Sequence, residues 1–310
     1  MELRTLLCYN IVQRGTPLRK FEVWSVTMSK RVVILADSTC DLSPALREAY
    51  DVRIQPLAVL LGDKEHYDGV DISPDMIYDH YQNYKELPKT AAPNIAAFAD
   101  FFARNVGEGE EAVCFTLSAT MSATYNNARL AALEHEGVYV VDSKNLSSGG
   151  GLLVLAAAEM AREGVPASEI AERCRAMTAL VDASFVVDDL EFLHKGGRCS
   201  AVAAFGANLL KLKPCIAVRE GKMGVSKKYR GAFLSVLEKY IADRIGDGTG
   251  IDRRRAFVTH AGCDEAIVAR CVELVRSYNL FDEVLVARAG CTVSSHCGKD
   301  TLGVLFVRAE

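Results

Sequence analysis

Hydroxyl side chains gather where an apolar run ends near residue 117. The run Ala112–Leu117 is short and bulky enough for a buried strand, and a helical pattern begins at Tyr125. A strand that leads into a helix leaves backbone N–H groups unpaired at the helix start, so this junction can hold an anion. Because the intervening segment 118–124 carries hydroxyls but no His, Lys or carboxylate, it suits holding a carboxylate or phosphate better than breaking bonds.

Two histidines, His260 and His296, each end a strand-like run. With Cys263, Cys291 and Cys297 they could supply zinc ligands, but no standard zinc spacing is met. Because the ligand types are present, a zinc-dependent regulator is nevertheless kept as an alternative function. His260 by itself is typical of a hydrogen-bonded structural residue, whereas the Ser, Gly and Lys residues around His296 favour a role in a site.

Two basic segments offer further contacts for an anion. Lys195–Arg198 follows an apolar, strand-like segment over 186–193, and its two glycines permit a tight turn. Lys227–Arg230 would suit phosphates or the acidic patch of a partner. Both segments are also typical of exposed basic surface, so neither defines a site by itself.

Familiar nucleotide-binding and hydrolase motifs are absent from the sequence. Gly149–Gly151 lacks the spacing of a dinucleotide fingerprint, and Gly298-Lys299 lacks the upstream glycine of a phosphate-binding loop. Ser118 does not lie in a GxSxG elbow, and the sequence assigns it no base. A small-molecule phosphotransferase or hydrolase that uses His296 and Ser118 remains an alternative.

The composition is that of a globular protein. Of 310 residues 50% are apolar and 25% charged, and the net charge is −4. This balance gives no general attraction to nucleic acid or to an anionic membrane surface, and no apolar stretch is long enough to span a bilayer. The ten cysteines are scattered without a CxxC pair, which favours reduced thiols in a cytoplasmic protein.

The elements that must position these residues fall into two domains. Residues 1–27 show no clear period and are predicted to be an N-terminal extension, with the folded part beginning at Met28. Over 28–180 strands and helices alternate, which predicts an α/β domain with a mostly parallel sheet and helices on both faces. Residues 181–310 have the pattern of an α+β domain.

Capping and turn residues predict several boundaries. A second extended run is expected over Ile54–Leu61, an apolar helix over Ala201–Leu212 and a hairpin turn over Arg219–Lys222. Three helix starts carry a capping side chain or a proline: Ser43-Pro44, Ser73-Pro74 and Pro93-Asn94.

Six motifs, taken in order along the chain, resemble the signatures of one protein family. They are Asp37–Leu42, Gln55–Leu57 through Tyr67–Ile72, Lys89–Pro93, Leu117–Tyr125, Val187–Leu193 into Gly196–Arg198, and Ser295–Gly298. Each motif is weak by itself, but six in order across nearly the whole chain are specific. On these motifs the chain from about residue 31 to residue 307 resembles the DegV family of bacterial fatty-acid-binding proteins.

The resemblance implies a Rossmann-like α/β domain, a second α+β domain and a long-chain fatty acid buried between them. It implies that Thr90 and Ser118 hold the carboxylate, and that Arg198, Arg230 and His296 line the mouth of the site or contact a partner. That partner would be a separate ATP-dependent fatty-acid kinase, which forms acyl phosphate. The chain itself would be a non-catalytic acyl carrier without a cofactor, and without stable insertion in a membrane.

Some residues bear on the same site less directly. Weaker candidates are Asp37, Ser38, Thr39, Ser122 and His260. The chain also departs from the family where Ala119 and Ala123 stand in place of the usual Ser and Gly, and where Ala91-Ala92 replace a usual Ser-Gln.

A lipid ligand agrees with simple energetics. Burying about sixteen methylenes at roughly 0.8 kcal/mol each contributes a gross ~13 kcal/mol, before the cost of ordering the chain. The head group then needs only to set the register of the chain. Hydroxyls and amides can do that for a carboxylate without the desolvation cost of a buried salt bridge.

Overall fold

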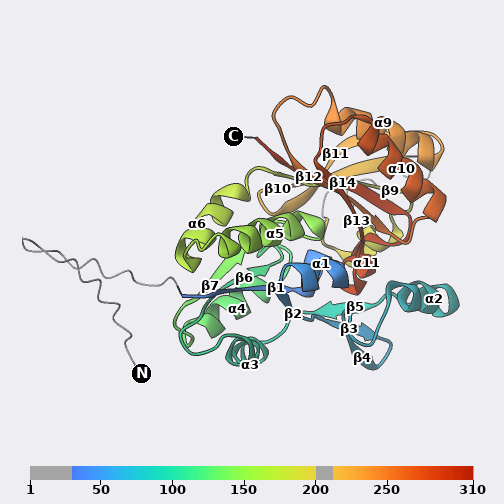
Figure 1. The fold of residues 1–310 in the computed structure, drawn as a ribbon. Coiled ribbons are helices and arrows are strands. Elements are labelled where there is room, and N and C mark those ends of the chain that lie inside the picture. The colour runs from blue at the N-terminus through green and yellow to red at the C-terminus, as the bar shows by residue number, and fades with distance from the viewer. Residues whose placement is uncertain (1–29, 200–211, 310) are drawn as a thin grey trace, which may run out of the picture.

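The computed structural model describes residues 30–199 and 212–309. The predicted extension over 1–27 and the helix expected over 201–212, apart from Leu212, lie outside the described residues. The described chain forms two sheet-centred parts with helix α5 (Ser148–Arg162) between them (Figure 1). In these ranges no helix combines the length and the apolar character needed to cross a membrane.

The first part is built on a four-stranded parallel sheet in the order β2-β1-β6-β7. Side chains of β1 alternate between its two faces: Val33 and Leu35 pack with α3 and α4, whereas Ile34 and Ala36 share a core cluster with α5. This confirms the predicted parallel sheet with helices on both faces (Figure 1). The bounds are β1 Val32–Asp37, β2 Val52–Gln55, β6 Glu111–Thr116, β7 Val138–Asp142, α3 Ile95–Asn105, α4 Thr124–Ala132 and α6 Ala167–Met177.

The three predicted helix starts are confirmed. Ser43 caps α1 (Pro44–Ala49), Ser73 caps α2 (Pro74–Tyr84) and Asn94 caps α3. In each helix the capping oxygen accepts a hydrogen bond from the N–H three residues later, a group that has no partner within the helix.

The extended run predicted over 54–61 is divided between two sheets. β2 ends at Gln55, and β3 (Ala58–Leu61) is the middle strand of a small antiparallel sheet with β4 (Lys64–Tyr67) and β5 (Lys89–Ala91). Pro56, which has no N–H for a strand pair, stands at the division. The small sheet carries Thr90, opposite Val59 in the register.

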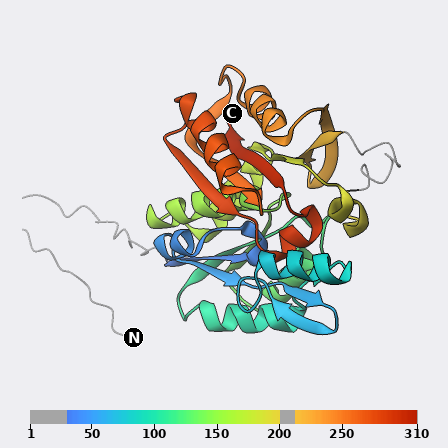
Figure 2. The ribbon, with the colours of Figure 1, turned by 90° about the vertical axis from the view of Figure 1, so that its right-hand side faces the viewer.

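The second part is a seven-stranded sheet, whose main path runs β11-β10-β9-β14-β12-β13 with β8 also pairing with β14. Helices α9 and α10 cover its outer face, and the other face packs toward α5 (Figure 2). Val187, Ile216 and Leu305 share a core cluster with Leu153 of α5, so the apolar core is continuous between the two sheets. The bounds are β8 Val181–Asp182, β9 Ser184–Val187, β10 Lys213–Arg219, β11 Lys222–Tyr229, β12 Ile251–Ala261, β13 Glu283–Arg288, β14 Thr301–Arg308, α9 Phe233–Ile245 and α10 Glu265–Ser277.

The predicted hairpin turn joins β10 to β11. Its central residues, Glu220 and Gly221, have φ of 49° and 81°, as the two-residue turns of twisted hairpins require. Two expectations were wrong: the run 186–193 predicted as strand-like is strand only to Val187, and helix α7 (Glu191–Gly196) begins before it ends, while helix α11 (Cys291–Cys297) replaces the strand-like run before His296. Because α11 is buried on nearly all sides, its sequence has no polar face that would show a helical period.

Candidate functional site

Several predicted site residues meet at a cavity of about 330 Å³, here called the outer cavity. It lies where β5, α11, the loop after β6 and the end of α7 come together. Thr39, Thr90, Ser122, Arg198 and His296 all line it, although they come from distant parts of the chain. The remaining lining residues are Leu57, Ala91, Ala92, Leu117, Met121, Ala123, Leu146, Met223, Thr292, Val293 and Cys297.

Thr90 and His296 form the polar pair of the outer cavity. Thr90 Oγ1 and His296 Nε2 are 2.8 Å apart, a hydrogen bond between side chains that are 206 positions apart in sequence. Burial, assisted by the positive charge of Arg198, lowers the pKa of His296 to about 4. The imidazole is therefore neutral at pH 7, so the pair presents hydrogen-bonding groups of low charge to a ligand.

The imidazole of His296 is packed against the end of α7. A Cβ on Gly196 would lie 2.8 Å from His296 Nδ1, so only glycine fits there without displacing the ring. Nδ1 itself is buried and has no hydrogen-bond partner among the described residues. Arg198, two residues further on, is exposed and donates from Nη1 to the carbonyl of Gly196 at 2.9 Å. Arg198 therefore places a positive charge at the solvent side of the outer cavity.

Helix α11 is held in place by two buried carboxylates that the sequence prediction did not select. Asp68 accepts hydrogen bonds from the N–H groups of Cys291 (2.7 Å) and Thr292 (3.0 Å), and Asp41 accepts one from Gly290 (2.8 Å). Carboxylates are favourable at a helix N-terminus because the peptide dipoles point their positive ends there. That signal was not usable from sequence alone, because α11 was not predicted as a helix.

The first amides of the loop after β6, at Leu117–Ala119, are paired within the protein. The N–H of Leu117 donates to Asp37 at 2.7 Å, that of Ser118 to the carbonyl of Asn145 at 2.8 Å, and that of Ala119 to Asp142 at 3.2 Å. The tertiary fold thus brings in protein acceptors for amides that local sequence leaves open. The later part of this loop, Met121–Ala123, is the part that lines the outer cavity.

Ser118 is buried, and its hydroxyl points to the second domain. Its Oγ donates to the carbonyl of Gly221 at 2.8 Å, in the hairpin turn between β10 and β11, and Thr120 donates to the same carbonyl. A Cβ on Gly221 would lie 2.5 Å from Ser118 Oγ, so glycine is needed for this approach. In this structure Ser118 therefore links the loop to the hairpin and lies outside the lining of the outer cavity.

The polar side chains of the first motif, which begins at Asp37, bond mainly to other groups of the protein. Asp37 accepts hydrogen bonds from the N–H and hydroxyl of Thr39, and burial raises its pKa to about 6. Ser38 donates to Asp68 at 3.1 Å and accepts from the N–H of Leu57 at 3.1 Å. Of these weaker candidates Thr39 lines the outer cavity, while Asp37 and Ser38 connect loops behind it.

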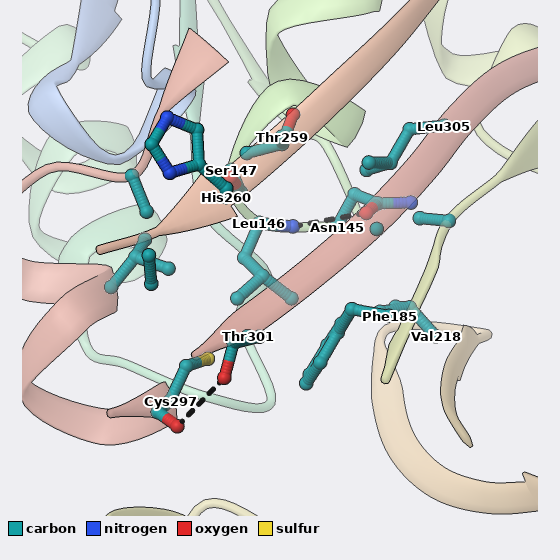
Figure 3. A pocket seen from close by; sticks show the side chains of 15 residues that line it. Asn145, Leu146, Ser147, Phe185, Val218, Thr259, His260, Cys297, Thr301 and Leu305 are labelled. Atoms are coloured by element: carbon teal, nitrogen blue, oxygen red, sulfur yellow. Dashed lines mark hydrogen bonds between the residues drawn. The ribbon is translucent and has the colours of Figure 1, made fainter. Parts of the chain in front are cut away.

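A second cavity of about 40 Å³ lies between the second sheet, the loop before α5 and helix α11, and is here called the inner cavity (Figure 3). Leu146, Val293 and Cys297 line both cavities, so these three side chains form the boundary between them. The volume of the inner cavity is room for roughly three water-sized groups. Its other lining residues are Asn145, Ser147, Ala183, Phe185, Val218, Thr259, His260, Ala261, Ala289, Thr301, Gly303 and Leu305.

The inner cavity is apolar because most of its hydroxyl groups are turned into the protein. Those of Ser147, Thr259 and Thr301 donate to Asp41, to Ser148 Oγ and to the carbonyl of Cys297, respectively. What faces the space is then mainly hydrocarbon from residues such as Leu146, Phe185 and Leu305 (Figure 3). Such a space suits an alkyl chain.

Two further predicted site residues lie apart from the outer cavity. Arg230 is exposed immediately after β11 and is not among the lining residues of either cavity. His260 lines the inner cavity instead, and burial, followed by the nearby charge of Arg288, lowers its pKa. Within the described ranges no group of three or more His, Cys, Asp and Glu is placed to hold a metal ion.

The chain is similar to proteins of one family along most of its length. A family model described as "Uncharacterised protein, DegV family" matches residues 31–309. A DegV domain-containing protein of Clostridium acetobutylicum is 31% identical over 280 residues, which are 90% of this chain and 99% of that protein.

Solved structures show the same fold. A fatty-acid-binding DegV family protein from Thermus thermophilus, 31% identical, has a TM-score of 0.84 over 90% of this chain and 99% of that one. A stearic acid-binding protein from Eubacterium ventriosum, 28% identical, has a TM-score of 0.75 over 89% of this chain and 97% of that one.

Proposed function

Because this chain belongs to the DegV family, we propose that it binds a long-chain fatty acid between its two domains. The carboxylate lies in the outer cavity, where it accepts a hydrogen bond from the hydroxyl of Thr90, which His296 holds in place. The acyl chain passes Leu146, Val293 and Cys297 and enters the inner cavity.

One observation carries this proposal: a cavity that contains the polar pair Thr90 and His296 shares a wall of three residues with an apolar cavity. A fatty acid has the same division, with a single charged end and a long hydrocarbon chain. The inner cavity, at about 40 Å³, is too small for a whole acyl chain, so lining side chains must move apart when the ligand binds. The burial of each methylene, worth about 0.8 kcal/mol, offsets the cost of that movement.

The head-group contacts fit an anion that is held without a buried ion pair. A neutral imidazole that donates to the hydroxyl of Thr90 leaves that hydroxyl free to donate to a carboxylate, and neither group is a charge that must lose its water on folding. Arg198, at the solvent side, adds a long-range attraction at little desolvation cost because its guanidinium is exposed. Ser118 as a direct carboxylate ligand stays a prediction, since its hydroxyl is bonded to Gly221 in this structure.

We propose further that the chain is a carrier whose bound carboxylate is presented to a separate fatty-acid kinase. The hydrogen-bond partner of His296 is a hydroxyl rather than a carboxylate, and burial makes its imidazole a weak base. That supports holding a carboxylate over activating a nucleophile. Arg198 and Arg230, both exposed, are the proposed contacts for the kinase.

Native mass spectrometry of the protein purified from cells tests the proposal. We expect a bound mass in the range of long-chain fatty acids, and a lower occupancy in the double variant T90A/S118A. A protein that carries no lipid and takes up none from added fatty acid would contradict lipid binding. Acyl phosphate formation from ATP by the chain alone, without a kinase, would contradict the carrier role.

A further inference from the structure

Positive charge collects in a groove of about 530 Å³, where the edge of the second sheet meets the loop between β7 and α5. This basic groove is lined by four cationic and two acidic side chains, which leaves a net charge of +2: Lys144, Arg219, Arg244 and Arg308 against Asp182 and Glu220. None of the residues predicted for the fatty-acid site lines it. Its other lining residues are Asn145, Thr178, Ala179, Leu180, Val181, Ala183, Ala217 and Val218.

Two guanidinium groups of the basic groove share one carboxylate. Arg308 donates to Asp182 from Nε at 2.9 Å and from Nη2 at 2.6 Å, and Arg244 of α9 forms an ion pair with the same carboxylate. The strand register brings them together, because Asp182 stands opposite Phe306 of β14 and so shares with Arg308 the sheet face that α9 covers. The side chains of Asp182 and Arg244 are only 10% and 21% exposed, so this ion cluster is largely withdrawn from water.

One carboxylate does not balance these two guanidinium groups. Arginine stays protonated in proteins, so the cluster keeps an excess positive charge. Burial, assisted by the charge of Arg308, lowers the pKa of Arg244, and burial lowers the pKa of Arg308 as well. The Nε of Arg244 is buried and has no hydrogen-bond partner among the described residues. A buried charge with an unpaired donor is unfavourable, so an anion that accepts from it would stabilise this arrangement.

Lys144 and Arg219 add two cations from opposite sides of the basic groove. Both side chains are exposed, and neither forms an ion pair or a hydrogen bond within the ranges that the structure describes. Their main chain is held: the N–H of Lys144 donates to Asp142 at 2.9 Å, and Arg219 leads into the hairpin turn whose Gly221 carbonyl accepts from Ser118 at 2.8 Å. Because one cation belongs to each domain, a ligand that contacts both would join the domains.

We propose that the basic groove is an anion site that binds a phosphate group, either as inorganic phosphate or as a small phosphate monoester. A phosphate dianion matches the net charge of +2, and its oxygens accept the hydrogen bonds that guanidinium and ammonium groups donate. The volume lies within the range of about 300–1,000 Å³ that small-molecule sites have. The site does not depend on the proposed fatty-acid function, although Asn145, Ala183 and Val218 line both this groove and the inner cavity.

Isothermal titration calorimetry with sodium phosphate tests the site, at pH 8 and with the ionic strength held constant by sodium chloride. We expect saturable binding to the wild-type protein. The variant K144Q/R219Q should fold like wild type, because it removes two exposed cations that have no partner in the described chain. It should bind phosphate at least about tenfold more weakly, since even one hydrogen bond between charged groups is worth that factor.

Methyl phosphate, titrated in the same way, distinguishes the two sources of the phosphate group. Tighter binding than that of inorganic phosphate identifies a monoester as the ligand, and equal or weaker binding identifies inorganic phosphate. Either result supports a phosphate site if it is lost in K144Q/R219Q.

The matched control is K64Q/K239Q, which removes two exposed lysines that do not line the basic groove. It changes the net charge of the protein by the same amount, and it should alter phosphate affinity by less than about twofold because distant surface charges are screened. An equal loss of affinity in both double variants would show a general attraction by surface charge and overturn the site. Absence of saturable phosphate binding to the wild-type protein would overturn it as well.

Discussion

The outer and inner cavities share three lining residues but differ in the role they give to a histidine. In the outer cavity His296 meets a threonine hydroxyl and stands near an exposed arginine. His260 borders the inner cavity through β12, with its side chain on the sheet face of Val258 and Leu302, and its Nδ1 has no partner in the described part of the chain. Burial lowers the pKa of both imidazoles. The residue type is the same, and the neighbours decide that only His296 has a polar partner at a cavity.

Removing Asp68 is expected to have the largest effect, because α11 serves both cavities. The variant D68A deprives the N–H groups of Cys291 and Thr292 and the hydroxyl of Ser38 of their acceptor. Hydrogen bonds to a charged group contribute about 1.5–3 kcal/mol each, so we expect a loss of about 4 kcal/mol in the free energy of unfolding. Urea denaturation measures it.

The matched control for this variant is D63A, which removes a carboxylate from an exposed turn of the same small sheet. It should change the free energy of unfolding by less than about 0.5 kcal/mol. If D68A is no more destabilising than D63A, α11 does not depend on its buried carboxylate. The inference that Asp68 supports both cavities through α11 is then wrong.

Acid is expected to destabilise the protein through His296. Its pKa is about 4 when folded and about 6.5 when unfolded. Between these values the unfolded chain binds a proton that the folded protein does not, so stability is lost as the pH falls from 6.5 toward 4. Linkage gives a loss of about 2 kcal/mol between pH 7 and pH 5 from this group.

The variant H296Q isolates that contribution, because glutamine does not titrate. Its free energy of unfolding should fall by about 2 kcal/mol less than that of wild type between pH 7 and pH 5, when both are followed by urea denaturation. Asp37 acts in the opposite sense in both proteins, since its pKa is raised from 3.8 to about 6 and its protonation favours the folded state. Identical pH profiles would show that His296 is not buried as a neutral ring.

Removing the hydroxyl of Thr90 should weaken binding of the head group and leave binding of the tail unchanged. T90V keeps the shape of the side chain but loses the hydrogen bond to His296. We expect about a tenfold loss of fatty-acid affinity, corresponding to ~1.4 kcal/mol, at every chain length. A competition series among fatty acids of different length would show a uniform loss for T90V. A length-dependent loss in T90V would contradict the division between the cavities.

The smallest expected effect is that of S118A. This variant loses the hydrogen bond to Gly221 and should lower the free energy of unfolding by about 1 kcal/mol. Its affinity for a fatty acid should fall less than that of T90V, because the hydroxyl faces the hairpin. An affinity loss as large as that of T90V, measured in the same titration, would instead show that Ser118 binds the carboxylate directly.

Local patterns in the sequence were sufficient for much of the fold. Ser43, Ser73 and Asn94 cap the helices they predicted, because capping involves groups within one turn. The alternation of strands and helices likewise predicted the parallel sheet of the first domain. The two short helices α7 and α11 were mistaken for strand-like runs: α7 begins with the last apolar residues of such a run, and α11, buried on most sides, has no amphipathic period.

The sequence by itself determined the family, the layered α/β architecture and the hydroxyl, imidazole and arginine groups that a carboxylate can use. These follow from local order along the chain, which a sequence displays directly. The tertiary structure alone decided that Thr90 meets His296, that Ser118 turns to Gly221 and that Leu146, Val293 and Cys297 line both cavities. The physical reason is that each of these relations joins residues from separate elements. Packing of the two sheets around α5 and α11 sets their distances, and no local pattern encodes it.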